Sequence, residues 1–138
     1  MTQLFIVDTS AWIFALRRQP KQSILQRIDE LLEQDAVATC GLIELELLGG
    51  AASESEFARL QSRLRGLHRL AIEENDWSAA ARLTFLMRRA GITVPFSDVL
   101  LSALALRHDA VLVHADRDFD LISAHSDLKV ESMADKVS

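Results

Sequence analysis

The sequence predicts a single α/β domain, with a mainly parallel central sheet that is flanked by helices on both faces. Two short apolar runs, Leu4–Val7 and Ala110–Val113, have the length and the β-branched content of buried strands. The segments between them carry apolar residues at helical spacing, and strands that alternate with helices favour a parallel sheet. No repeat, low-complexity tract or linker interrupts the 138 residues, so we expect one domain over residues 1–138.

Apolar spacing and helix-capping residues define the order of the elements. The expected strands are residues 4–7, 36–39 and 110–113, with an edge strand at 129–131. The expected helices begin at Thr9 or Ser10, Pro20, Leu42, Ser53, Asn75 or Asp76, and Ser97. The helix from Ser97 is apolar nearly all round over residues 99–106, so we expect it to be central and buried.

Composition and charge exclude several classes of protein. The net charge is −5, from 15 basic and 20 acidic residues, which argues against holding nucleic acid by bulk charge alone. An enzyme that binds phosphates through divalent cations is compatible with this balance. Histidines without paired spacing and a lone Cys40 give no zinc pattern and no internal disulfide, so the cytoplasm is the simplest location. No apolar run approaches the roughly 20 residues that span a bilayer.

Four scattered carboxylates are the candidate site residues. Asp8 and Asp116 each follow a predicted strand, and ligands bind at the carboxyl ends of parallel strands. Asp98 falls in the first turn of a helix that enters from the same edge, and Glu46 lies in a helix that needs an apolar face. Carboxylates that converge without a cation repel one another, and hard ions such as Mg²⁺ or Mn²⁺ relieve that repulsion through oxygen ligands. Such a site suits phosphodiester hydrolysis.

Other interpretations of these acids stay open at this point. Asp8 is as compatible with a helix N-cap as with a metal ligand, and Asp98 could complement the dipole of its helix. A phosphotransferase of the haloacid-dehalogenase type also begins with a strand and an aspartate. It needs a second aspartate where Ser10 stands, and a lysine before the final acids. A receiver domain would need an acidic pair at the first strand and a lysine after the last, and neither is present.

Four short motifs resemble those of PIN-domain proteins, in particular the VapC-type ribonuclease toxins of bacterial toxin–antitoxin pairs. In chain order they are Ile6–Ser10, Glu46–Ala51, Pro95–Ala103 and His114–Phe119. Each motif alone is weak evidence, but four in order at family-like spacing cover essentially the whole chain. The resemblance implies a PIN-like fold and a Mg²⁺- or Mn²⁺-dependent endoribonuclease that is the toxin of a type II pair. A non-toxin PIN-domain nuclease or a catalytically silent PIN-like binding module is the alternative.

The resemblance also assigns roles to the acids. The implied catalytic and metal-binding residues are Asp8, Glu46, Asp98 and Asp116. The first and third are expected as direct metal ligands, and the other two are expected to act partly through water. Glu44 competes with Glu46 for the helix position, although the register of the motif favours Glu46. Asp118 is a possible fifth acid, or else a surface residue or the cap of a turn.

The implied partners are an RNA substrate, a VapB-like antitoxin and a second copy of the chain. We expect a homodimer, and a heterotetramer or larger assembly with the antitoxin. The antitoxin would lay an amphipathic segment into a groove between helices and block the acids. Apolar helix surface for this purpose surrounds Trp12, Ile13, Leu47 and Leu48.

Two further expectations concern polar side chains. The family often has serine or threonine where this chain has His114, so Thr9 or Ser10 is expected to supply a hydroxyl near the acids instead. Candidate phosphate contacts are Arg17, Arg18 and Arg117. The arginines at positions 59, 63, 65 and 69 recur at helical spacing and are better explained as a solvated face.

Overall fold

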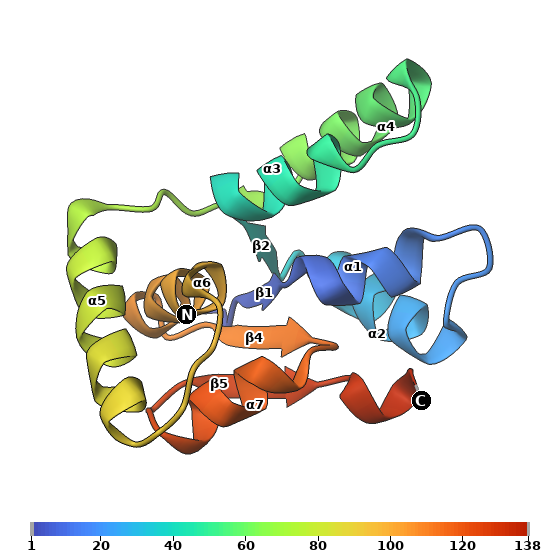
Figure 1. The fold of residues 1–138 in the computed structure, drawn as a ribbon. Coiled ribbons are helices and arrows are strands. Elements are labelled where there is room, and N and C mark those ends of the chain that lie inside the picture. The colour runs from blue at the N-terminus through green and yellow to red at the C-terminus, as the bar shows by residue number, and fades with distance from the viewer. Residues whose placement is uncertain (1, 138) are drawn as a thin grey trace.

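A computed structural model of the chain describes residues 2–137 and shows one five-stranded sheet with helices packed around it (Figure 1). The strands are β1 (Phe5–Val7), β2 (Val37–Thr39), β3 (His68–Arg69), β4 (Val111–His114) and β5 (Lys129–Ser132). The helices are α1 (Thr9–Leu16), α2 (Gln22–Glu33), α3 (Gly41–Gly49), α4 (Glu54–Arg65), α5 (Glu74–Arg89), α6 (Phe96–Arg107) and α7 (Arg117–Ala124), followed by the 3₁₀ turn η1 (Ala134–Lys136). The α/β class is confirmed, whereas the two-residue strand β3, helix α7 and the turn η1 were not predicted from the sequence pattern.

All strand pairs are parallel, in the order β3-β2-β1-β4-β5. The first strand lies in the centre, and the chain adds β2 on one side of it and β4 on the other. The register pairs Val7 with Val113, and the Asp8 amide donates to the Val113 carbonyl at 2.9 Å. Since the strand order changes direction between β1 and β4, this is the switch point where open α/β sheets bind ligands.

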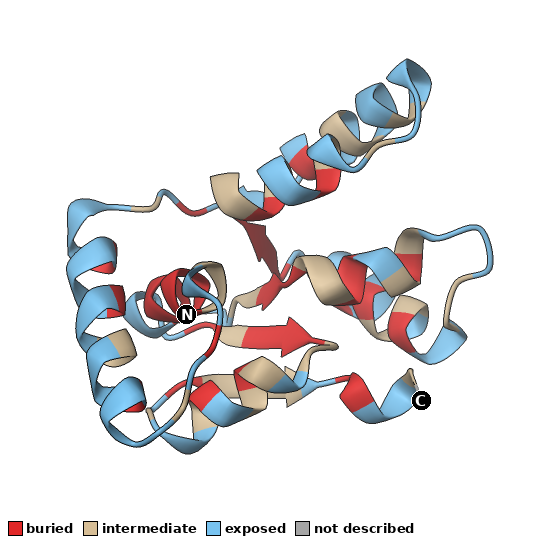
Figure 2. Ribbon diagram, in the orientation of Figure 1, coloured by how far each residue is buried: buried red, intermediate tan, exposed pale blue. Residues whose placement is uncertain are grey.

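The core lies between the sheet and the helices that cover it. Buried residues concentrate in the strands and in α6, whereas the outer faces of α4 and α5 are exposed (Figure 2). The pairs α1–α2 and α5–α6 lie on opposite sides of the strands, and α3 with α4 projects as a hairpin (Figure 1). As predicted, α6 is central, with every residue from Val99 to Ala105 buried. Within residues 2–137 no helix is long and apolar enough to span a membrane.

Several helix starts differ from the sequence prediction. Helix α2 begins at Gln22, after the expected Pro20, and α3 begins at Gly41, one residue before the expected Leu42. The N-cap of α1 is Asp8, whose carboxylate accepts the Ser10 amide, and not Thr9 or Ser10. The N-cap of α5 is Glu73, and that of α6 is Pro95, so the expected start at Ser97 was wrong. Proline fixes its own φ near the helical value, which allows α6 to start directly after it. These shifts keep Asp98 in the first turn of α6.

Candidate functional site

Asp8 and Asp116 lie just beyond the carboxyl ends of the two central strands. Asp8 follows β1, is almost fully buried, and caps α1. Asp116 follows β4 and caps α7, where its Oδ1 accepts the amide of Asp118 at 3.0 Å. Each carboxylate therefore points at the amino end of a helix, whose partial positive charge favours an anion. The sequence prediction of a shared edge is confirmed.

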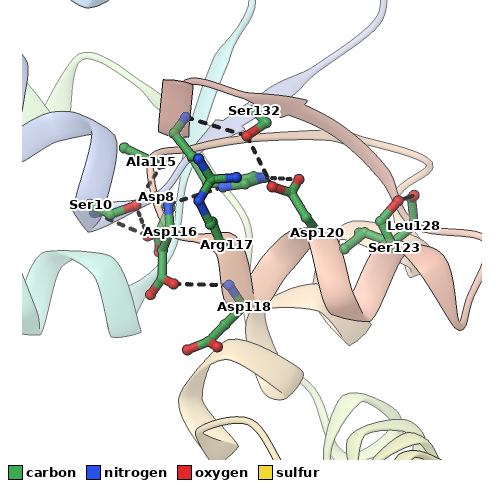
Figure 3. A network of polar contacts seen from close by, with 12 residues as sticks. Asp8, Ser10, Ala115, Asp116, Arg117, Asp118, Asp120, Ser123, Leu128 and Ser132 are labelled. Atoms are coloured by element: carbon green, nitrogen blue, oxygen red, sulfur yellow. Dashed lines mark hydrogen bonds and ion pairs between the residues drawn. The ribbon is translucent and has the colours of Figure 1, made fainter. Parts of the chain in front are cut away.

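Hydroxyl groups from the start of α1 hold two of the acids. Ser10 Oγ donates to Asp8 Oδ2 at 2.6 Å and accepts the Ala115 amide at 3.0 Å (Figure 3). It thus ties the loop after β1 to the loop after β4. Thr9 Oγ1 donates to Glu46 Oε1 at 3.3 Å. One hydroxyl was expected from the sequence, from Thr9 or Ser10, and in the structure each of the two bonds to one acid.

Asp98 is the electrostatically strained member of the site. Its Oδ2 is buried and has no hydrogen-bond partner among the described residues. Burial, followed by the charges of Asp8, Asp116, Asp118 and Glu46, raises the pKa of the Asp98 carboxyl to about 7. Near neutral pH the carboxyl therefore retains its proton far more readily than an ordinary aspartate.

A tight group of three carboxylates forms around this residue. Oxygen atoms of Asp98, Asp116 and Asp118 all lie within 4.8 Å of one another. Asp118 had been weighed as a fifth acid or a mere cap, and it belongs to this group; burial and the neighbouring Asp116 raise its pKa. Asp8 is outside the tight group, although its charge is the largest charge effect on Asp98.

The choice between Glu44 and Glu46 is decided by their partners. Glu44 forms an ion pair with Arg69, with Oε1 2.7 Å from Nε, on the β3 side of α3. The Glu46 side chain bonds to Thr9, and its pKa is raised by partial burial and by the charge of Asp8. Glu46 thus faces the other acids, in agreement with the motif register, although the residue is largely exposed and not inside an apolar face.

A buried histidine lies behind the acids. His114 is fully buried at the end of β4, with Nδ1 3.2 Å from the Asp116 amide and Nε2 3.1 Å from Asp120 Oδ1. Burial lowers the pKa of His114 against the opposing effect of Asp120. The sequence prediction treated His114 only as a departure from a family pattern and did not consider Asp120. His114 lies on a strand and Asp120 lies six residues later on a helix, and no sequence motif indicates that two residues so placed pair with each other.

The five acids lack cationic partners. Among residues 2–137, none of them forms an ion pair with lysine, arginine or histidine. Arg117, the basic residue next in sequence to Asp116, pairs instead with Asp135 at 2.9 Å. An all-oxygen donor set with an unpartnered buried oxygen on Asp98 fits a hard divalent cation such as Mg²⁺ or Mn²⁺.

Fold and site together define an α/β protein with an acidic metal-type site at the switch point of a parallel sheet. A family model described as PIN domain matches residues 5–124. Ribonuclease VapC11 of Mycobacterium tuberculosis H37Rv is 35% identical over 133 residues, which cover 94% of this chain and 98% of that protein. Ribonuclease VapC18 of the same strain is 28% identical, covering 88% of each. The chain therefore belongs to the PIN-domain family and, within it, to the VapC group.

Solved structures share the fold. VapBC2 from Rickettsia felis, bound to a DNA fragment from its promoter, contains a chain that superposes with a TM-score of 0.79 at 18% identity, covering 94% of this chain and 98% of that one. DNA-bound VapBC from Salmonella typhimurium gives 0.79 at 20% identity, covering 95% and 98%. At these identities the likeness is one of fold.

The pKa of Asp98 predicts how the metal-free protein responds to pH. A carboxyl with a raised pKa binds more protons in the folded than in the unfolded chain, so its contribution to stability falls as pH rises from about 4 to about 7. Asp98→Asn removes the titrating carboxyl and therefore removes this loss of stability at higher pH. In EDTA we expect the variant to melt at a higher temperature than the wild type at pH 8, and the difference to shrink at pH 5. Asp127→Asn, at an exposed position, is the control; equal shifts in both variants would contradict the assignment.

Proposed function

We propose that the chain is a Mg²⁺- or Mn²⁺-dependent endoribonuclease and the toxin of a type II toxin–antitoxin pair. The observation that carries the proposal is the uncompensated carboxylate cluster at the switch point, in a chain of the VapC group. All four acids of the family motifs are present, which favours an enzyme over a silent binding module. We take residues 1–138 as one PIN domain that acts on cellular RNA in the cytoplasm.

Each acid receives a role from its surroundings. Asp98, Asp116 and Asp118 would hold the divalent cation, because their oxygens converge and one has no other partner. The cation supplies Lewis-acid activation of water and neutralises phosphate charge. Glu46, whose pKa is raised and which Thr9 orients, is suited to accept a proton from the attacking water. Asp8 completes the negative field and fixes Ser10 between the two loops.

The exposed arginines near this edge are the candidates for holding the RNA strand. Arg17 and Arg18 follow α1, and Arg17 stacks over Phe14 with its guanidinium carbon 4.9 Å from the ring centroid. A guanidinium packed on a ring can contact phosphate while its neighbouring ring receives a base. Trp12, the other aromatic residue of α1, is buried and belongs to the core.

Cleavage of RNA tests the proposal directly. Wild-type protein with Mg²⁺ or Mn²⁺ should cleave total cellular RNA, and EDTA should stop the reaction. Asp98→Asn should lower the rate by more than the roughly 10–100-fold that outer partners of metal ligands contribute, and Asp8→Asn should lower it by about that amount. Sequencing of the cleaved ends would then identify the RNA. Activity that survives EDTA, or equal rates in all three proteins, would rule out the mechanism.

A second surface is suited to the antitoxin. A groove among α1, α2, α3 and α4 is lined by Trp12, Leu16, Leu47, Leu60 and Leu64, with Asp29 and Arg63 at its polar margin. The indole Nε1 of the tryptophan has no hydrogen-bond partner among the described residues. We propose that the apolar face of an antitoxin helix fills this groove. Of the four residues around which this apolar surface was expected from the sequence, Trp12 and Leu47 line the groove.

Expression in cells tests both the toxin and the groove. The wild-type chain should arrest growth when made alone, and Asp98→Asn should be harmless. Co-expression with the small protein encoded beside it should restore growth to the wild type. Leu60→Glu should stay toxic in that co-expression because a charge in the groove excludes the antitoxin helix. Leu121→Glu, on exposed α7 surface, should be rescued. Harmless wild-type expression would refute the toxin but not the nuclease.

A third surface is suited to a second copy of the chain. The outer face of α5 exposes Glu74, Trp77, Ala81, Phe85 and Arg88. Along the helix this face presents an acid, an aromatic ring, a small residue, a second aromatic ring and a base. The small residue, Ala81, is at the midpoint of the series. Two such helices packed antiparallel would pair acid with base and ring with ring around that midpoint. We propose this self-complementary face as the interface of the homodimer.

Charge exchange on α5 tests the antiparallel pairing. Glu74→Arg alone should weaken the dimer roughly tenfold, since two exposed pairs are lost by symmetry and like charges meet. Adding Arg88→Glu should restore the affinity because the pair is then reversed. Phe85→Glu should give monomers. Analytical ultracentrifugation measures each step, with Arg65→Glu on α4 as the control. A double variant weaker than the single one would contradict this arrangement.

A further inference from the structure

His114 has a defined protonation state that follows from its partners. An amide N–H can only donate, so Nδ1, 3.2 Å from the Asp116 amide nitrogen, must be the unprotonated acceptor. The ring proton of the neutral imidazole then sits on Nε2 and is donated to Asp120 Oδ1 at 3.1 Å. Both ring nitrogens are thus used, and the ring, which packs tilted against Phe119 at 5.2 Å, cannot turn over without losing both bonds.

Asp120 is itself held by the end of the last strand, β5. Ser132 Oγ donates to Asp120 Oδ2 at 3.1 Å and accepts the Ala134 amide at 3.3 Å (Figure 3). The Met133 amide donates to the His114 carbonyl. A continuous series of hydrogen bonds therefore runs from the end of β5 through the carboxylate and the imidazole to the Asp116 peptide.

The loop that carries two site acids is fixed at consecutive amides. The Ala115 amide donates to Ser10, and the next amide, of Asp116, donates to His114. With both peptide units held, the direction of the Asp116 side chain and the start of α7 are set. These in turn place the Asp116 and Asp118 oxygens within 4.8 Å of Asp98.

We propose that His114, in its Nε2-protonated neutral form and held by Asp120, is a positioning residue that aims Asp116 and Asp118 at the metal site. The inference rests on the proposed metal-dependent nuclease. It adds to that proposal a residue that touches neither metal nor RNA. Two side chains can each replace half of its function: asparagine places an amide oxygen near the position of Nδ1, whereas glutamine reaches towards the position of Nε2.

The first test is the tautomer. ¹⁵N NMR of selectively histidine-labelled, metal-free wild-type protein should show a pyrrole-type Nε2 and a pyridine-type Nδ1 for His114. Asp120→Ala should weaken this preference, and His114→Leu identifies the resonance by its loss. A ring protonated on Nδ1, or on both nitrogens at neutral pH, would overturn the inference. This measurement is made on the wild-type protein, so it does not depend on whether the variants fold.

The second test separates positioning from stability. His114→Asn keeps an acceptor for the Asp116 amide and should bind Mn²⁺ within about threefold of the wild type, whereas His114→Gln should bind it roughly 10–100-fold more weakly. Both lose one buried hydrogen bond, so both should melt at similarly lowered temperatures, and the exposed His125→Gln should change neither property. Equal Mn²⁺ affinity in the two His114 variants would overturn the inference.

The two levels of the proposal fail in different ways. A wild-type protein that binds Mn²⁺ with the expected split between variants but cleaves no RNA would refute the nuclease and leave the positioning role. A wild-type protein that cleaves RNA but shows no split would refute the positioning role alone. Absence of Mn²⁺ binding to the wild type would overturn both.

Discussion

The parallel pairing of β1 with β4 is the interaction on which the rest of the site depends. The two strands are adjacent although more than a hundred residues separate them in sequence, and their register brings Asp8 beside the loop that carries Asp116. Because β1 connects away towards β2 and β4 connects away towards β5, no helix crosses over the edge between them. Open α/β sheets bind ligands at such a switch point, and the acids gather there.

The folded chain tolerates this concentration of negative charge by means of helix ends and hydroxyl groups. Asp8 and Asp116 cap α1 and α7, and Asp98 and Asp118 lie in the first turns of α6 and α7. Three helix amino ends thus face one cluster, and each favours an anion by roughly 0.3–1 kcal/mol. This offsets only part of the repulsion, because the pKa of Asp98 is still raised to about 7. The remaining imbalance is what a divalent cation would neutralise.

Sequence reasoning captured the parts of this arrangement that local pattern determines. Short apolar strands and the buried helix over Val99–Ala105 specify the sheet and its cover, and strand ends located Asp8 and Asp116. Asp118 was undervalued because its direction depends on where α7 begins, and the N-cap Asp116 sets that start through a hydrogen bond. The helix starts at Glu73 and Pro95 were missed for the same reason: a cap is defined by backbone geometry, and several neighbouring residue types can serve.

The sequence pattern does not show which polar side chains pair when they lie far apart in the chain. Nothing in the spacing of Glu44 and Glu46 shows that Arg69, from β3, takes the first and leaves the second to the site. The motif register favoured Glu46, and the ion pair of Glu44 supplies a physical reason for that choice: an acid neutralised by arginine adds little to a cation site. Burial in an apolar helix face was argued for Glu46, and the residue is instead largely exposed. Partial burial of its carboxyl is still the largest cause of its raised pKa, followed by the charge of Asp8.

The same helices serve the groove and the site, and this links inhibition to catalysis. Trp12 lies one turn after Asp8 on α1, and Leu47 follows Glu46 on α3. A helix seated against this tryptophan and leucine contacts α1, which Asp8 caps, and α3, which carries Glu46. The hydroxyl of Thr9 on α1 donates to Glu46 and so joins the two helices. An antitoxin bound there would restrain the part of the cluster that lies outside the tight carboxylate group. The acids proposed to hold the cation lie at the starts of α6 and α7, which do not line the groove, so an antitoxin helix in the groove would leave those acids uncovered.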